Sequence, residues 1–499
     1  MRTALAAGLV VLSACGSKSD GSFGSDFLLG TAIAGFQTEM GCPTLPPARC
    51  EDRASDWYAW ITTPALLADP NLHLNGDQPS RGPGFYELYE ADLDRAAHEL
   101  QGNALRLSIE WSRVFPTATD GLDGESLRAA ASADALAWYH SVFKAMRARG
   151  LQPFVTLHHY TLPAWIHDAP GCHKDLVHCA ARGWLDKERI VREIAKYAGF
   201  VAREFGGEVD LWATLNEPFT AVVLAGFVLP SADRSNPPGV TLRWAEAKAA
   251  NQAMIEAHAR MADAVHANDT ISAFGGKAAQ VGIVYNLQSV SPADPKSLLD
   301  QTAARNLAYL MNEQFLNGAL KGDLDANLDG QIVHRPDLGG NTDFLGINYY
   351  VRATAKGLAQ PYFPTEAPLM TFDPFALDLR GDAAGIGEAL AAGAKYGLPI
   401  YVTETGLEDA ADTGAAESWI GETLWRVQQA RAAGVPVRGY FYWTLMDNYE
   451  WNHGMSLRLG LYAVDPADAS KQRTARPRAV KALARIAAAR SVPADLRPR

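Results

Sequence analysis

The sequence predicts an α/β protein built as a single (β/α)₈ barrel, the TIM-barrel fold. Eight short, continuously apolar runs indicate buried strands, and amphipathic stretches with apolar residues three and four positions apart lie between them. Apolar strands that alternate with helices are typical of a parallel sheet covered by helices, and eight such units favour a closed barrel. A length of 499 residues fits one such domain, because α/β barrels routinely exceed the usual single-domain size.

The eight predicted strands follow one another along the whole chain. The fourth shows the pattern: "DLWATLNE" is an apolar run that ends in Asn216 and Glu217 and is stopped by Pro218. The predicted strands are residues 27–34, 104–111, 152–159, 210–217, 280–287, 343–350, 398–405 and 437–445. The clearest helical patterns between them are residues 84–102, 189–206 and 244–266.

Charge and composition exclude some classes of partner. The chain is 48% hydrophobic and 20% charged, which is ordinary for a soluble globular protein. Its net charge of -11 argues against nucleic acid or an anionic membrane surface as a binding partner. A small-molecule or oligosaccharide ligand remains, and the oligomeric state is not predicted.

The first residues predict export. "MRTALAAGLVVLSAC" has one basic residue and an apolar stretch too short to span a bilayer permanently, as in a signal peptide. Its ending resembles a bacterial lipobox, so we expect residues 1–14 to be removed and Cys15 to carry a lipid. Residues 15–24 would be a flexible tether, 25–490 the barrel and 491–499 a tail. The alternative is an ordinary cleaved signal in which the cysteine is incidental.

The remaining four cysteines form two close pairs, Cys42 with Cys50 and Cys172 with Cys179. In an exported protein, an even number of cysteines in short loops predicts two local disulfides. "CHKDLVHC" also contains two histidines, so a zinc site at the second pair is the alternative. The spacing matches no common zinc motif, and an oxidising compartment favours the disulfide.

Polar residues stand at or just beyond the carboxyl ends of the predicted strands. In a barrel these ends meet on one face, where the active site lies. Helix capping could explain one or two polar strand ends, but it does not explain so many on one face. The residues are Gln37, His159, Asn216, Glu217, Tyr350, Glu404 and Trp443.

Glu217 and Glu404 are the two carboxylates of this set. A pair of carboxyl groups facing one pocket is the minimal equipment for cleaving a glycosidic bond, since one protonates the departing oxygen while the other attacks the anomeric carbon. Burial and the second charge raise the pKa of such carboxyl groups, so one of them can hold a proton near neutrality.

Seven motifs in order extend this hypothesis to a family. From about Phe27 to Ala488 the chain resembles family 1 glycoside hydrolases, the retaining β-glycosidases. Details such as "AGFQTEMG" and "IEWSRVFP" are similar to the archaeal-type branch, which accepts β-glucosides, β-galactosides and β-fucosides. The motifs are "FLLGTAIAGFQTEMG", "NALRLSIEWSRVFP", "PFVTLHHYTLP", "ATLNEP", "FLGINYY", "YVTETG" and "GYFYWTLMDNYEWNHG".

The resemblance implies a role for each matching residue. Glu217 would be the acid/base and Glu404 the nucleophile, and Asn216 would bind the sugar 2-OH. Arg106 and Tyr350 would hold the nucleophile ionised and oriented. The residues implied to bind the non-reducing sugar are Gln37, His159, Glu450 and Trp451, with Trp443 as a stacking floor. The family needs no metal or organic cofactor, so we expect none.

Three positions depart from the family pattern. Tyr160 stands where the family usually has Trp, Leu459 where it has Phe, and Thr405 where it has Asn. None of these changes removes a catalytic group, but the first two alter the walls around the sugar. Glu450 carries a separate implication, because family members that act on 6-phosphorylated sugars lack this carboxylate. Its presence favours unphosphorylated sugars.

The sequence therefore predicts a retaining, exo-acting β-glycosidase that hydrolyses terminal unphosphorylated β-D-glucosides, with β-galactosides and β-fucosides as further substrates. A transglycosidase that uses the same covalent intermediate is one alternative, and a non-catalytic carbohydrate-binding surface lipoprotein is another. Hydrolysis and transglycosylation differ on the acceptor side, where residues 117–126, 229–240 and 353–375 carry no recognisable motif. The presence of both glutamates argues against the non-catalytic alternative.

Overall fold

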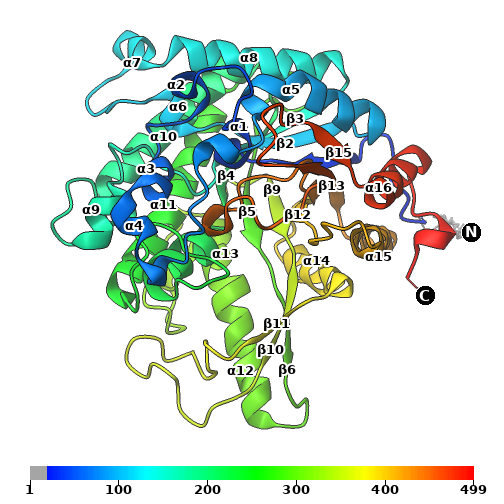
Figure 1. The fold of residues 1–499 in the computed structure, drawn as a ribbon. Coiled ribbons are helices and arrows are strands. Elements are labelled where there is room, and N and C mark those ends of the chain that lie inside the picture. The colour runs from blue at the N-terminus through cyan, green and yellow to red at the C-terminus, as the bar shows by residue number, and fades with distance from the viewer. Residues whose placement is uncertain (1–19, 499) are drawn as a thin grey trace, which may run out of the picture.

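The computed structural model describes residues 20–498, and its centre is a closed barrel of eight parallel strands (Figure 1). The predicted fold class is therefore confirmed. Each barrel strand falls inside one of the eight predicted runs. In chain order they are β1 (Leu28–Ala32), β2 (Ala104–Ser108), β3 (Gln152–His158), β4 (Leu211–Asn216), β5 (Gln280–Asn286), β9 (Phe344–Asn348), β12 (Ile400–Thr405) and β13 (Val437–Trp443).

The first and last strands close the barrel. β1 pairs in parallel with β2 on one side and with β13 on the other, and the register sets Leu28 opposite Gly439 and Ala32 opposite Trp443. The other strands follow in chain order around the ring, so all eight carboxyl ends lie on one face. This arrangement is what allows residues far apart in the sequence to build one site.

Helices surround the barrel because one stripe of each is apolar. In α10, residues Ile190, Ile194, Tyr197 and Val201 recur at three- and four-residue spacing and are all buried. The longer helices are α5 (Phe85–Asp94), α8 (Ala133–Ala148), α10 (Lys187–Phe205), α11 (Trp244–Asn268), α12 (Leu298–Ala308), α14 (Ile386–Ala394), α15 (Ala415–Ala432) and α16 (Pro477–Ala489). The shorter ones are α1 (Gly35–Glu39), α2 (Pro47–Cys50), α3 (Asp56–Thr62), α4 (Pro64–Leu67), α6 (Trp111–Val114), α7 (Gly124–Ala130), α9 (Ala169–Lys174) and α13 (Gln314–Leu316).

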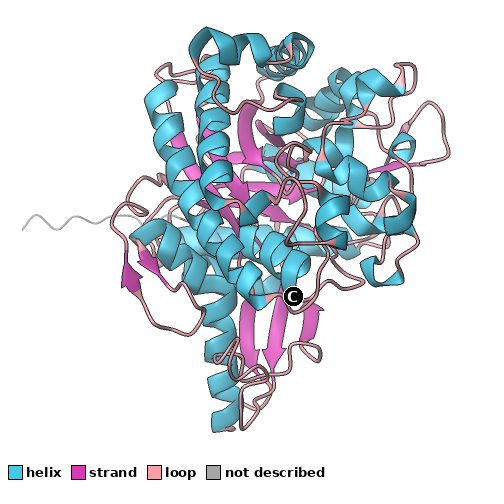
Figure 2. Ribbon diagram, turned by 90° about the vertical axis from the view of Figure 1, so that its left-hand side faces the viewer, coloured by secondary structure: helices cyan, strands magenta, loops and turns pink. Residues whose placement is uncertain are grey.

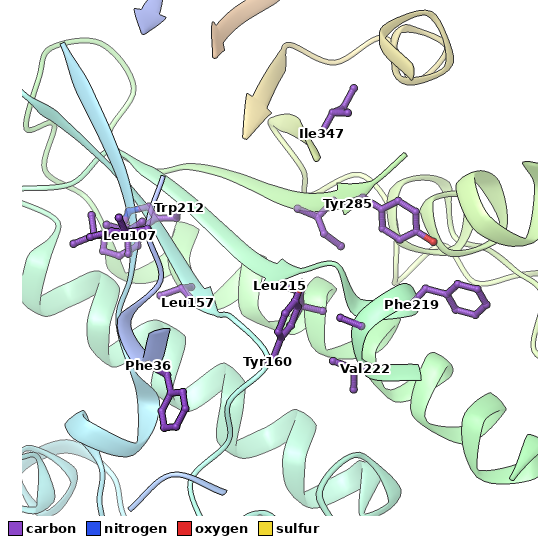
Figure 3. Packing of buried hydrophobic residues seen from close by; sticks show 14 of the residues in the cluster. Phe36, Leu107, Leu157, Tyr160, Trp212, Leu215, Phe219, Val222, Tyr285 and Ile347 are labelled. Carbon is purple, nitrogen blue, oxygen red and sulfur yellow. The ribbon is translucent and has the colours of Figure 1, made fainter. Parts of the chain in front are cut away.

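Successive side chains of each strand alternate between the barrel interior and the helices, as the two-residue period of a strand requires. Four aromatic rings fill the lower interior in edge-to-face contacts, with centroids 5.2 to 5.5 Å apart: Phe154, Phe344, Tyr401 and Phe441. Outward-facing side chains such as Trp212 belong to the larger core between sheet and helices (Figure 3). The barrel is therefore solid below its carboxyl-end face.

The segments between β5 and β9 and between β9 and β12 leave the barrel and form a small sheet of their own. A three-stranded sheet of β6 (Ser289–Pro292), β10 (Val351–Ala355) and β11 (Asp378–Gly381) lies beside α12 and projects from the body (Figures 1 and 2). Two small hairpin-like pairs complete the strands: β7 (Asp323–Leu324) with β8 (Val333–His334), and β14 (Tyr462–Val464) with β15 (Arg473–Ala475).

Both ends of the described chain pack against the barrel. Phe23 is buried and stacks on Phe27 at 4.6 Å, and Arg490 donates to the backbone carbonyls of Phe23 and Gly24. The ordered body thus begins before the predicted boundary at residue 25, because an aromatic side chain inside the expected tether finds an apolar site. Val492 is also buried. The predicted signal peptide and Cys15 lie outside the described residues.

Both predicted disulfides are present. Cys42 is bonded to Cys50, and Cys172 to Cys179. The zinc alternative is wrong for the second pair, because both of its sulfur atoms are used in the bond. Of the two histidines in that loop, His173 contacts the Pro238 carbonyl and Asp69, while His178 is exposed beside Asp175. Between residues 20 and 498, no helix is both long and apolar enough to span a bilayer.

A cluster of three buried carboxyl groups, those of Glu39, Asp52 and Glu110, lies near the carboxyl end of β2. Glu110 accepts hydrogen bonds from Ser108 Oγ at 2.7 Å and Thr161 Oγ1 at 2.5 Å. Glu39 accepts hydrogen bonds from Arg113 and Tyr139. The negative charges of Glu39 and Asp52 both act on Glu110. Burial first, and then the charges of Glu39 and Asp52, raise the pKa of Glu110 to about 8.

This cluster predicts a pH-dependent stability. A carboxyl group whose pKa rises on folding contributes stability at pH values below its unfolded pKa, near 4.5, and that stability is lost as the pH rises through about 8. We therefore expect Glu110→Gln to gain thermal stability relative to the natural protein between pH 5 and 8, by up to roughly 1.4 kcal/mol per pH unit. The exposed Glu125→Gln is the control. A difference in melting temperature that does not grow with pH would contradict the shift.

Candidate active site

The two predicted carboxylates lie on the carboxyl-end face of the barrel. Glu217 directly follows β4, and Glu404 is the next-to-last residue of β12. Both are nearly enclosed, with 8% and 4% of their surfaces exposed. A carboxylate is costly to bury without partners, so the side chains around these two groups decide what they can do.

Glu404 is held by two donors. Arg106 Nη1 lies 2.5 Å from its Oε1, and Tyr350 Oη donates to its Oε2 at 2.9 Å. Arg106 is itself fully buried and donates to three further oxygens, on Thr156, Thr403 and Asn216. The guanidinium is thus satisfied on all sides and presents a fixed positive charge to Glu404.

Glu217 is surrounded by neutral donors. Tyr160 Oη donates to its Oε2 at 2.9 Å, and Asn348 Nδ2 donates to its Oε1 at 2.8 Å. Asn286 Nδ2 lies farther from the same oxygen, at 3.4 Å. No arginine or lysine forms an ion pair with Glu217 in the described part of the chain. The two carboxylates therefore differ in environment: one is paired with a cation, and the other is held by a phenol and an amide.

One asparagine connects the two carboxylates. Asn216 Oδ1 accepts from Arg106 Nη2 at 2.7 Å and from Asn348 Nδ2 at 3.2 Å, so it joins the residue that holds Glu404 to one that holds Glu217. Its Nδ2 lies 3.3 Å from His159 Nε2. Because Asn216 Nδ2 is a donor, His159 Nε2 accepts and the proton of this imidazole is on Nδ1. Burial first, and then the charge of Arg106, lower the pKa of His159 well below its usual value, so it is neutral.

Aromatic rings and one more carboxylate complete the site. The ring of His159 is nearly parallel to that of Trp443, with centroids 5.8 Å apart, and to that of Trp451, with centroids 5.9 Å apart. Gln37 Nε2 donates to Glu450 Oε2 at 2.9 Å. All ten residues that the sequence predicted as catalytic or sugar-binding thus lie within one connected set of contacts.

Five further residues contact this site, and the sequence did not predict their contacts. Tyr160 was noted as a departure from the family pattern, but nothing indicated that its phenol contacts Glu217. Asn348 is part of "FLGINYY", two residues before Tyr350, and this position was the available signal. The five residues are Tyr160, Arg234, Asn286, Asn348 and Asn448.

Arg234 is the most unexpected of the five. Its Nη2 lies 3.2 Å from Glu450 Oε1, and it comes from the segment 229–240, which carried no motif. Burial opposes the charge of Arg234, but Glu450, Tyr160 and Glu217 outweigh that effect and raise its pKa above the ordinary value. Arg234 therefore remains a cation beside Glu450 at every relevant pH.

The backbone of the site adopts an uncommon conformation at three points. Tyr160, Glu217 and Trp451 have φ angles of 72°, 42° and 51°, in the left-handed region that residues with a side chain rarely occupy. Such residues persist only where the surrounding contacts over-determine them, and they cluster at active sites. Here they occur two residues after β3, directly after β4 and in the 3₁₀ turn η9 (Trp451–His453).

The protonation of Glu404 reflects opposing effects. Burial raises its pKa, Arg106 lowers it, and the negative charge of Glu217 raises it again, with a result of about 7. If Glu217 holds a proton, its repulsion disappears and Glu404 ionises more readily. Burial and the charge of Glu217 thus oppose ionisation of Glu404, and the cation Arg106 favours it.

Comparisons with known proteins agree with this geometry. The model of the family described as "Glycosyl hydrolase family 1" matches residues 19–487. A β-galactosidase of Pyrococcus woesei is 34% identical, covering 93% of this chain and 97% of the relative. A bifunctional β-D-glucosidase/β-D-fucosidase of Bifidobacterium breve is 28% identical, covering 89% and 94%.

A solved structure extends the likeness to three dimensions. The β-glycosidase of Thermosphaera aggregans superimposes with a TM-score of 0.79 at 27% identity, covering 95% of this chain and 98% of that one. The family match spans nearly the whole described chain, and the buried glutamates stand at the ends of two barrel strands. This chain belongs to glycosyl hydrolase family 1 and is a β-glycosidase.

Proposed function

We propose that the protein removes terminal β-D-glucosyl, β-D-galactosyl and β-D-fucosyl residues from unphosphorylated β-glycosides, with retention of configuration. One observation carries the sugar-binding part: several polar side-chain atoms of the site are buried, and none has a hydrogen-bond partner within residues 20–498. They are Gln37 Oε1, His159 Nδ1, Arg234 Nη1 and Asn448 Nδ2. Buried polar atoms are almost always paired, so a ligand rich in hydroxyl groups is the natural complement.

The first step forms a bond between Glu404 and the sugar. Glu404, ionised beside Arg106, attacks the anomeric carbon, and Glu217 gives its proton to the glycosidic oxygen as the bond to the aglycone breaks. The leaving group departs as a neutral alcohol, and the sugar becomes an ester of Glu404. Asn216, fixed by Arg106 and Asn348, is placed to hydrogen-bond the sugar 2-OH, a contact that strengthens at the transition state.

The second step releases the sugar. Once Glu404 is an ester, its negative charge is gone, and Glu217, now ionised, accepts a proton from an attacking water molecule. The oxygen of that water bonds to the anomeric carbon, and the Glu404 carboxylate leaves. Tyr160 and Asn348 donate to Glu217 throughout and stabilise its ionised form in this half of the cycle.

The hydrogen bond from Tyr350 gives a test of the nucleophile's protonation. This bond and the charge of Arg106 lower the pKa of Glu404 against the effect of burial. Without the phenol that pKa should rise, so Tyr350→Phe should move the acidic limb of the kcat/KM profile to higher pH and reduce the plateau about tenfold or more. An acidic limb that stays in place would contradict the assignment. Tyr396→Phe is the matched control, because the Tyr396 hydroxyl also donates a hydrogen bond, but to Asn317.

The substrate range rests on Glu450 and on the relatives. Two proteins similar to this chain are a β-galactosidase and a bifunctional β-D-glucosidase/β-D-fucosidase. Glu450 is positioned to accept hydrogen bonds from O4 and O6 of the sugar. A 6-phosphate would lie beside this carboxylate, and because the two negative charges repel each other we expect phosphorylated sugars to be poor substrates.

A panel of aryl β-D-glycosides tests the proposal. It comprises the glucoside, galactoside, fucoside, mannoside, xyloside and the 6-phosphates of the first two. We expect the glucoside to be preferred, with the fucoside and galactoside close behind. Faster cleavage of a 6-phosphoglycoside than of its unphosphorylated counterpart would overturn the substrate class without affecting the assignment to the family.

From the N-terminal sequence alone, we further propose that the protein is exported and anchored in the bacterial cell envelope by a lipid on Cys15. Expression of the full chain followed by membrane fractionation tests this. Cys15→Ala should move the protein from the membrane to the soluble fraction, whereas Ser17→Ala should not. Equal partition of the natural chain and Cys15→Ala would contradict lipid anchoring.

A further inference from the structure

Arg234 stands on a tight turn beside the sugar site. The turn is closed by a hydrogen bond from Ser231 N to the Arg234 carbonyl at 2.8 Å, and Arg234 N donates to Ser231 Oγ at 3.3 Å. The turn follows the π-helix η5 (Pro218–Val228), which begins directly after Glu217. Arg234 thus belongs to the segment that connects the proposed acid/base to the outer helix α11.

This segment is fastened to the part of the chain that carries Glu450 and Trp451. Asn452 Nδ2 donates to the Ala232 carbonyl at 2.8 Å, and Ser235 N donates to Asn452 Oδ1 at 3.3 Å. His453 Nε2 lies 3.1 Å from the Asp233 carbonyl. On the other side, His173, inside the second disulfide loop, contacts the Pro238 carbonyl at 2.9 Å. Arg234 is therefore held in place by contacts on both sides of the turn.

The guanidinium uses only part of its hydrogen-bonding capacity. Nη2 pairs with Glu450 Oε1, while Glu450 Oε2 is occupied by Gln37. Nη1 is buried and finds no acceptor among the residues that the structure describes. A buried guanidinium nitrogen without an acceptor is costly, and a polar group of a ligand would satisfy it.

The position of Arg234 indicates which part of a sugar it reaches. A sugar with its anomeric carbon between Glu217 and Glu404 and its O4 at Glu450 has two edges between these points. The edge that carries O2 and O3 faces Asn216 and His159, which are hydrogen-bonded to each other. The other edge carries C5 and its exocyclic C6 group. Gln37 lies at Glu450 Oε2 and Arg234 at Glu450 Oε1, so Arg234 occupies the end of this carboxylate that Gln37 leaves free, and we assign it to the C6 edge.

We propose that Arg234 is a specificity-determining residue that donates from Nη1 to the exocyclic oxygen at C6 of the bound sugar. The proposal rests on the proposed function. Gln37 donates to one carboxylate oxygen of Glu450 and Arg234 donates to the other. In addition, Arg234 would donate directly to O6 of the sugar. A site with a buried donor for a hydroxyl group discriminates against the analogue that lacks it, because the donor is then left unpaired. Sugars without O6 should therefore depend far less on Arg234.

Substrate pairs that differ only in O6 test this inference. β-D-Galactoside and β-D-fucoside form one pair, and β-D-glucoside and 6-deoxy-β-D-glucoside form another. Arg234→Met keeps most of the aliphatic stem but loses every donor. It should reduce kcat/KM about tenfold or more on the 6-hydroxyl member of each pair and less than about threefold on the 6-deoxy member. Arg243→Met is the matched control, because Arg243 lies at the end of the same segment and pairs with Glu246 at the surface.

Two further variants separate a direct contact from an effect on Glu450. Arg234→Lys keeps a positive charge near Glu450 but not the forked donors, and it should lose most of the preference for O6. In a Glu450→Gln background, Arg234→Met should still reduce activity more on the 6-hydroxyl substrates. Melting temperatures close to that of the natural protein establish that each variant is folded.

Equal losses on both members of each pair, or no further effect of Arg234→Met in the Glu450→Gln background, would overturn the proposal. Either result would leave the proposed function intact. The proposed function fails separately, if the natural protein cleaves none of the four glycosides.

Discussion

Replacing Glu404 by glycine should reduce hydrolysis of aryl β-glucosides by about 10⁴-fold or more, because it removes the carboxylate on which the covalent intermediate forms. Added azide or formate should restore turnover by entering the space of the missing side chain. Azide attacks from the side that Glu404 occupied, so the product should be the α-glycosyl azide, with inverted configuration. Product analysis by NMR, together with the rate, measures both parts of this result.

Glu408 provides the control for this experiment. It is exposed, four residues after Glu404 in the loop that follows β12, and it accepts a long hydrogen bond from Arg458 N, at 3.4 Å. Glu408→Gly should leave activity nearly unchanged and should not respond to azide. A Glu404→Gly protein that retains most of its activity without any added anion would remove Glu404 from the role of nucleophile.

The second large effect concerns Glu217. Glu217→Gln keeps the shape of the side chain, and its amide can still accept from Asn348 while Tyr160 turns its hydroxyl to accept. The variant cannot protonate a leaving group, so the glycosylation rate should fall by about 10²- to 10⁴-fold for alkyl glycosides. The glycosylation rate should change little for dinitrophenyl glycosides, because the dinitrophenolate leaves without needing a proton. Pre-steady-state bursts across a leaving-group series measure this dependence.

Azide distinguishes the two carboxylates a second time. In Glu217→Ala, the ester on Glu404 still forms from an activated substrate, and azide can then replace water without the help of a general base. Attack on that ester gives the β-glycosyl azide, so the two variants should yield opposite anomers. The same anomer from both, or a glycosylation rate that falls equally for all leaving groups, would show that the roles are assigned wrongly.

The sequence predicted the barrel well because its signals are local. An apolar run such as "DLWATLNE" ends at a proline, and the structure places β4 and Glu217 accordingly. The two disulfides were equally accessible, since each joins cysteines only eight or seven residues apart. Two questions could be answered only from the structure. The Cys172–Cys179 bond excludes the zinc alternative, and the burial of Phe23 places the start of the ordered body before residue 25.

The contacts that tune the site were less accessible. Glu217 and Glu404 could be recognised by their position at strand ends, but their partners come from other strands and loops. Tyr160 reaches Glu217 from 57 positions away in the sequence, and Asn348 does so from 131 positions away. Arg234 meets Glu450 across 216 positions. Tyr160 and Asn348 lie within motifs and Arg234 does not, but in none of the three cases does the sequence indicate which distant residue the side chain contacts.

By itself, then, the sequence determined the number and order of the barrel strands, the family and the two glutamates at strand ends, because periodicity and motifs are properties of neighbouring residues. Only the tertiary structure decided which groups surround those glutamates, that burial raises the pKa of Glu404 to about 7 against the effect of Arg106, and that a cation lies beside Glu450. Burial and Coulomb forces depend on distances in space, and closure of the barrel sets those distances by bringing eight strand ends and their loops together.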